Sequence, residues 1–132
     1  MNSTTPSRPK ARPKYYDLNL LNLPAPGLLS ILHRISGAVM FLLLIPLLLF
    51  IMQQTLKSEA GFMQWKVLLT HPLAKLLLLG FIWAYAHHFF AGIRYLLLDL
   101  HIGVAKAPAQ RSAWAVNVLG IATTLIAGWF LW

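Results

Sequence analysis

The stretch PLAKLLLLGFIWAYAHHFFAGIRYLLLDL, residues 72–100, decides the fold class of this chain. A hydrophobic run of about 20 residues is long enough to cross a bilayer as a helix, and this run is longer. It contains His87 and His88, then Arg94 and finally Asp99. Ionisable side chains are costly inside a membrane, so they usually mark a function and have a partner. An imidazole at this depth can hold an iron, pass a proton or hydrogen-bond another helix.

The composition supports an all-α, integral membrane protein. Of the 132 residues, 58% are hydrophobic and only 11% are charged, whereas about 25% of the residues of a soluble domain are charged. A few short membrane helices bury little of a large cofactor on their own. We therefore expect an obligate partner.

The net charge of +8 comes from eleven Lys and Arg residues against three acidic residues. The basic residues flank the apolar segments and form no stripe interleaved with aromatic residues, which argues against a nucleic-acid partner. They indicate membrane orientation and contact with anionic lipid. The chain has no cysteine, which excludes disulfides, a thiolate-ligated or covalently attached haem, and an iron–sulfur cluster held by this chain.

The sequence predicts an extended, basic N-terminal arm at residues 1–27 and a three-helix transmembrane domain at residues 28–132. The arm has five prolines, which oppose helix formation, and it forms either a solvated tail or a strap on a soluble partner. Pro46 is expected to kink the first helix, and Ser112 is a candidate N-cap of the third. A short interfacial helix is expected between Lys57 and His71. The predicted spans are about 28–54, 72–100 and 112–132.

The distribution of basic residues predicts the orientation. The N-terminal arm and the loop at 101–111 are basic, whereas in the loop at 57–71 Glu59 offsets part of the positive charge. The positive-inside rule then places the N-terminus in the cytoplasm. Both polar clusters of the apolar spans would lie towards the cytoplasmic side.

The first polar cluster is SILHRISG, residues 30–37. Ser30, His33, Arg34 and Gly37 share one helix face, and the missing side chain of Gly37 permits close approach to the backbone. Arg34 lies a full turn or more inside the span, where it needs a partner. The alternatives are that Arg34 only reaches up to lipid phosphates and that the serines bond their own helix backbone.

The second polar cluster forms two neighbouring stripes on the helix at 72–100. A histidine with a glycine one turn away suits a flat macrocycle, because neutral imidazole is a common haem ligand and the glycine leaves room for the ring. The alternative is an interhelical hydrogen bond. We assign no chemical role to Asp99. One stripe holds His88, Gly92, Tyr95 and Asp99, and the other holds His87, Ala91, Arg94 and Leu98.

The other histidines do not suit a second axial ligand from this chain. We expect His33 to lie near its helix end and His71 on the opposite side of the membrane, so that neither matches the depth of His88. If haem is bound, the sequence predicts that another subunit supplies its second ligand.

These two clusters resemble the signatures of the succinate dehydrogenase cytochrome b556 subunit family. Residues 30–37 are similar to SxxHRxTG, with Ser36 in place of threonine, and residues 88–99 are similar to HxxxGIRHxxxD, with Tyr95 in place of the second histidine. Arg12-Pro13 and Leu23-Pro24 resemble the family's proline-containing lead-in. The resemblance covers roughly residues 12–132.

The resemblance implies one of two membrane anchors of respiratory complex II, in the bacterial inner membrane. It implies one haem b with His88 as axial ligand to the iron, and His33, Arg34 and Tyr95 near the haem propionates. Ser30 and Arg34 would bind ubiquinone. Tyr95 cannot carry the positive charge of the usual histidine, and His87 is an additional candidate ligand.

The implied partners are a second anchor with the other haem ligand, an iron–sulfur subunit and a flavoprotein. The chain would be a non-catalytic subunit that contributes to the quinone site of a tricarboxylic acid cycle and respiratory-chain oxidoreductase. The alternatives are a quinol:fumarate reductase anchor and a cofactor-free structural anchor. A proton-coupled transporter is disfavoured, because Asp99 lies near an interface and the chain has no internal repeat.

Overall fold

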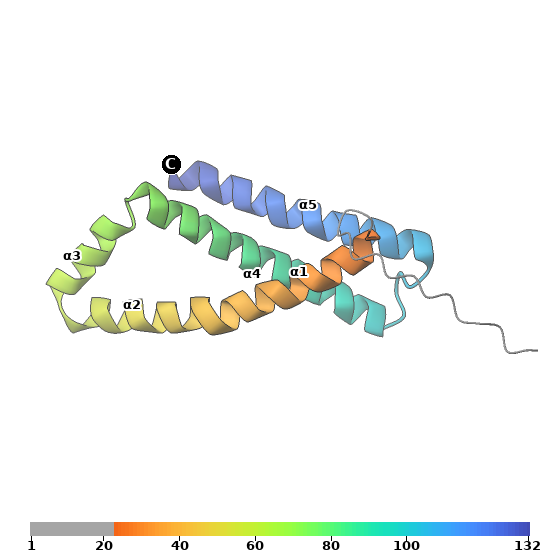
Figure 1. The fold of residues 1–132 in the computed structure, drawn as a ribbon, viewed down its shortest axis with the longest axis horizontal. Helices are drawn as coiled ribbons and strands as arrows, with labels where there is room; N and C mark the ends of the chain where they lie inside the picture. The colour runs from red at the N-terminus through yellow and green to blue at the C-terminus, as the bar shows by residue number, and fades with distance from the viewer. Residues whose placement is uncertain (1–22) are drawn as a thin grey trace, which may run out of the picture.

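A computed structural model describes residues 23–132, so residues 1–22 of the predicted arm at 1–27 lie outside the described residues. The last residues of the predicted arm, from Ala25 on, are helical and not extended. The described chain forms helices joined by short turns, without a strand (Figure 1). Three helical stretches are long and apolar enough to cross a membrane, which confirms the predicted fold class. The elements are α1 (Ala25–Val39), the π-helix η2 (Met40–Leu44), α2 (Ile45–Lys57), α3 (Glu59–Leu68), α4 (Pro72–Asp99) and α5 (Lys106–Leu131).

The helices α1, η2 and α2 form one continuous stretch of 33 residues, Ala25–Lys57. Pro46 explains the π-helical turn before it: proline has no N–H and its ring crowds the carbonyl four residues earlier. The N–H of Ile45 donates to the carbonyl of Met40, five residues back. The sequence predicts a kink at Pro46, and in the structure the helix widens into a π-helical turn just before this proline.

The helix ends differ from the sequence expectation at three places, and one of them is the end of the first span, which lies at Lys57 and not near residue 54. The helix α1 begins at Ala25, with Pro26 in its first turn, where proline is tolerated. The helix α5 begins at Lys106 after an extended Ala105, so the prediction that Ser112 is its N-cap is wrong. The predicted interfacial helix is α3, whose N-cap Ser58 accepts a hydrogen bond from the N–H of Gly61.

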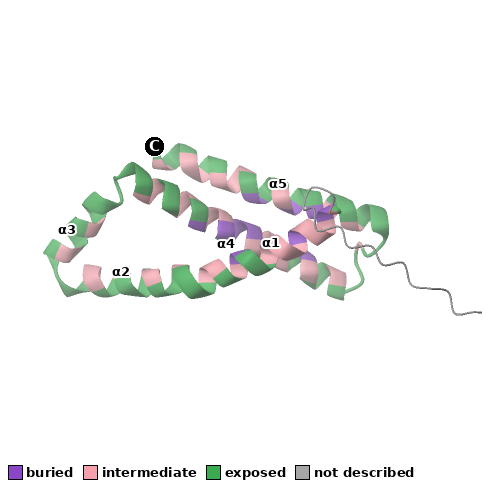
Figure 2. Ribbon diagram, viewed as in Figure 1, coloured by how far each residue is buried: buried purple, intermediate pink, exposed green. Residues whose placement is uncertain are grey.

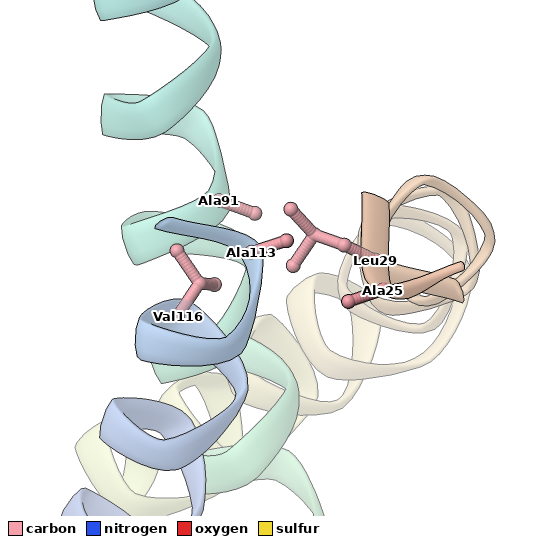
Figure 3. Packing of buried hydrophobic residues seen from close by; sticks show 5 residues of the cluster. All are labelled: Ala25, Leu29, Ala91, Ala113 and Val116. Carbon is pink, nitrogen blue, oxygen red and sulfur yellow. The ribbon is translucent and has the colours of Figure 1, made fainter. Parts of the chain in front are cut away.

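The three spans meet where α1 begins, α4 ends and α5 begins, which we call the α1 end of the bundle (Figure 1). Leu29 of α1 is fully buried against the other two helices (Figure 3). Its neighbours are small, which lets helix backbones approach closely in a membrane. The other members of this junction are Ala25, Ala91, Ala113 and Val116.

Arg94 fastens the last part of α4 to the start of α5. It is 6% exposed, its Nε donates to Oγ of Ser112 at 3.0 Å, and its Nη2 donates to the carbonyl of Ala109 at 3.1 Å. Hydrogen bonds from a charged donor contribute about 1.5–3 kcal/mol each. Ser112 therefore serves as a tertiary partner instead of a helix cap.

Most of the large apolar side chains are exposed along the bundle (Figure 2). Only three buried hydrophobic residues of the described part are larger than alanine, namely Leu29, Phe81 and Val116. Because the exposed residues lie on membrane-spanning helices, lipid or other membrane helices must cover them.

Leu29→Ala tests the importance of the junction for stability. Truncating a buried leucine costs about 2–5 kcal/mol, so we expect a clear drop in the melting temperature of the detergent-solubilised protein in its complex. Leu48→Ala is the matched control, because Leu48 is 54% exposed. Equal melting temperatures for the two variants would show that the junction does not hold the bundle together.

Candidate functional site

The predicted site residues of α1 and α4 come together at the α1 end. The rings of His33 and His88 are stacked, with centroids 4.2 Å apart and an interplanar angle of 19°. The ring of Tyr95 lies 5.1 Å from that of His33. The prediction that His33 does not match the depth of His88 is therefore wrong. It neglected the crossing of α1 and α4, which brings the start of one span to the later half of the other.

Two groups on α1 fix the ring of His88. Its Nδ1 is 3.1 Å from the carbonyl oxygen of His33 and 3.3 Å from Oγ of Ser36. The hydroxyl of Ser36 donates its proton to the same carbonyl, so both groups can only accept from the ring. Nδ1 of His88 therefore carries the proton, and neutral His88 has its lone pair on Nε2.

Gly37 makes this position of the ring possible. A Cβ at Gly37 would lie 2.9 Å from Cε1 of His88, closer than packed side chains come. The sequence prediction that something approaches the backbone at Gly37 is confirmed, and the approaching group is the imidazole of His88. Gly92, one turn after His88, has no atom within 4 Å of a Cβ placed there.

Arg34 and Ser30 form a polar pair on the exposed face of α1. The Nε of Arg34 donates to the carbonyl of Ser30 at 3.2 Å, and its Nη2 donates to Oγ of Ser30 at the same distance. Arg34 is exposed. The contacts hold the guanidinium one turn back along the helix, and its Nη1 keeps its donors for a ligand.

The two stripes predicted on α4 face different neighbours. His87, Ala91 and Arg94 are buried, and both His87 and Arg94 contact α5. His88 and Tyr95 face His33 on α1. The hydrogen bonds of Arg94 thus go to α5, and its guanidinium also lies over the ring of Tyr95, 5.5 Å from the ring centroid.

Asn117 of α5 was not predicted from the sequence as a partner of the polar clusters. Its Oδ1 lies 3.1 Å from Nε2 of His87. An isolated asparagine in a third apolar span was the available signal, because a buried polar side chain needs a partner. Asp99 is exposed at the end of α4.

Comparison with known proteins identifies the family of this chain. The sequence profile of the family described as "Succinate dehydrogenase/Fumarate reductase transmembrane subunit" matches residues 8–127. The chain belongs to this family. It is 34% identical over 125 residues to the succinate dehydrogenase cytochrome b556 subunit of Coxiella burnetii strain RSA 493, with 92% of this chain and 97% of the relative covered. The chain is thus a membrane anchor subunit of the succinate dehydrogenase cytochrome b type, as the two signatures implied.

Gly37→Ala is expected to lower the stability of this anchor. The new methyl group must push the ring of His88 away from α1, which strains the bonds to His33 and Ser36. Gly80→Ala is the control on the same bundle, since nothing lies within 4 Å of its Cβ position. We expect a lower melting temperature of the purified complex for the first variant alone; a similar loss in both would contradict the tight contact at Gly37.

Proposed function

We propose that this subunit binds one haem b and ubiquinone and passes electrons from an iron–sulfur subunit to the quinone. The proposal rests above all on the hydrogen bonding of His88. Its Nδ1 is engaged by the carbonyl of His33 and by Ser36, and the described residues give its Nε2 no hydrogen-bond partner. Metal-ligating histidines commonly donate their second ring N–H to a carbonyl in this way, which orients the ring and raises its basicity.

The surroundings of His88 fit a porphyrin. The described residues contain no group of three or more side chains that could hold a bare metal ion. A haem needs no such group, because the macrocycle supplies four nitrogens and the protein only the axial ligands. The open space at Gly92 gives a flat ring access to this part of α4.

The stacking of His33 on His88 supports a second ligand from another subunit. The two rings lie face to face, so they cannot occupy opposite sides of one iron. In our proposal His33, Arg34 and Tyr95 instead face the haem propionates. Of these, Arg34 provides a permanent positive charge for charge-assisted hydrogen bonds, and the phenol of Tyr95 provides a neutral donor.

The pair of Ser30 and Arg34 is the proposed contact with ubiquinone. The hydroxyl of Ser30 and the guanidinium of Arg34 can both donate to one carbonyl oxygen of the quinone. Such donors stabilise the negative charge that develops on this oxygen during reduction. When bound, haem offers a reversible one-electron store beside this route. We propose that the protons come from the cytoplasmic side, so that proton pumping is not required.

The exposure of the site supports the need for partners. Arg34 is exposed and His88 is only half-buried, so this chain leaves both groups open on the helix surface. A half-open apolar groove of about 290 Å³ lies elsewhere, between α2, α3 and α4. A second anchor would complete the haem pocket, and the iron–sulfur and flavoprotein subunits would dock at the α1 end.

The proposed location is the bacterial inner membrane, with the α1 end at the cytoplasmic side. Lys106 and Arg111 lie at the start of α5, near this end, and the sequence that precedes α1 is also basic. This asymmetry is what the positive-inside rule requires. The name of the Coxiella burnetii relative, a succinate dehydrogenase subunit, supports the direction from succinate to quinone, while the family also includes fumarate reductases.

His88→Ala tests the haem proposal. Loss of the axial nitrogen should remove the b-type absorption bands of the purified complex or reduce them strongly. His71→Asn is the control, because His71 caps α4 at the opposite end and asparagine can also cap a helix. Full haem content and an unchanged spectrum in His88→Ala would exclude His88 as the ligand and favour a cofactor-free anchor.

Arg34→Ala tests the quinone proposal. Loss of a charged hydrogen-bond donor costs about 1.5–3 kcal/mol, so quinone reduction should slow by roughly 10- to 100-fold. Electron transfer from succinate to a soluble dye should stay at the level of the unaltered complex, since the dye does not need this site. Unchanged quinone kinetics would remove Arg34 from the quinone site.

A further inference from the structure

The two adjacent histidines of α4 are held by different helices. His88 contacts α1, whereas His87 lies between α4 and α5 and is only 1% exposed. Neighbouring side chains on a helix point about 100° apart. Nε2 of His87 lies 3.1 Å from Oδ1 of Asn117 on α5. The orientation of α4 is therefore fixed from two directions within one turn.

The backbone of α5 lies close to His87. A Cβ at Gly120, which follows Asn117 by one helix turn, would lie 3.4 Å from both Cα and Cβ of His87. The ring of Trp83 covers His87 from the previous turn of α4, with centroids 5.3 Å apart. The imidazole thus packs against its own helix and α5, and it lines a small cavity together with Leu28 and Leu32 of α1.

The cost of this arrangement argues for a role beyond packing. The Nδ1 of His87 is buried and has no hydrogen-bond partner among the described residues. An unpaired buried polar atom costs free energy that a leucine of similar size would avoid. A directional bond to Asn117 fixes the rotation of α4, which an apolar side chain does less well.

We propose that His87 and Asn117 are positioning residues that set the rotation of α4 about its axis and thereby the position of His88. Side-chain tips lie about 5–6 Å from a helix axis, so a rotation of about 10° moves them by about 1 Å. Such a shift would break the 3.1 Å contact between Nδ1 of His88 and the carbonyl of His33. The inference rests on the proposed function, because its effect is measured on a haem ligated by His88.

The direction of the effect follows from the ligand chemistry. The hydrogen bond from Nδ1 of His88 to the carbonyl raises the basicity of Nε2. A more basic ligand favours the ferric over the ferrous state. Weakening this bond should therefore raise the midpoint potential of the haem and change the electron paramagnetic resonance g values of the oxidised complex.

The experiment measures both quantities in the purified, haem-containing complex. His87→Leu removes the bond from the side of α4, and Asn117→Leu removes it from the side of α5. Both should raise the potential, and the double variant should raise it no further than the single ones, since the three remove the same bond. His87→Gln, whose amide can still reach Asn117, should restore the original potential and g values at least in part.

Lys75→Met is the matched control for a general weakening of the contact between α4 and α5. The Nζ of Lys75 donates to the carbonyl of Leu131 on α5 at 2.6 Å, and Lys75 lies about 18 Å along α4 from His87 at 1.5 Å per residue. Its loss should leave the haem potential and the g values unchanged. An equal shift in Lys75→Met would overturn the positioning role, because any loosening of α5 would then suffice.

The outcomes separate this inference from the proposed function. The proposed function is contradicted if the unaltered complex contains no b haem. It is also contradicted if the His88→Ala complex keeps its full haem content. If His88→Ala loses the haem but His87→Leu and Asn117→Leu keep the original potential and g values, only the positioning role is wrong. If the complex with His87→Leu does not assemble, Asn117→Leu alone tests the positioning role, because this variant leaves the sequence of α4 unchanged.

Discussion

An imidazole in a membrane helix must find its polar partners within the protein, and this requirement organises the whole bundle. His88 obtains its partners from the backbone and Ser36 of α1, and His87 obtains its partner from α5. Lipid offers no alternative to these bonds. The three spans are therefore tied together at the level of the candidate site, and the small residues around Leu29 allow them to come close enough.

The part of the fold that follows from hydrophobic length could be predicted from the sequence. The three spans and the interfacial helix follow from apolar runs interrupted by Gln53, Gln54 and the predicted loop at 101–111, although the observed loop is shorter, at 100–105. The exact start of α5 did not follow, because a polar Ser112 before an apolar run also looks like a helix cap. Its hydroxyl is instead a partner of Arg94, and such a tertiary contact has no local signal.

The candidate site was predictable as a set of residues but not as an arrangement. Spacing placed Ser30 with Arg34 and separated His87 from His88, and both expectations agree with the structure. The stacking of His33 on His88 depends on where α1 crosses α4. A crossing point is set by the packing of Leu29 and Gly37 against other helices, so it cannot be read from the periodicity of one helix.

The π-helical turn at Met40–Leu44 also separates two parts of the first span. It takes up one more residue than an α-helical turn of the same height. This extra residue changes the rotational register between the half with Ser30 to Gly37 and the half that leads to α3. The residues of the second half therefore face the membrane in a different register from those of the half that contacts His88.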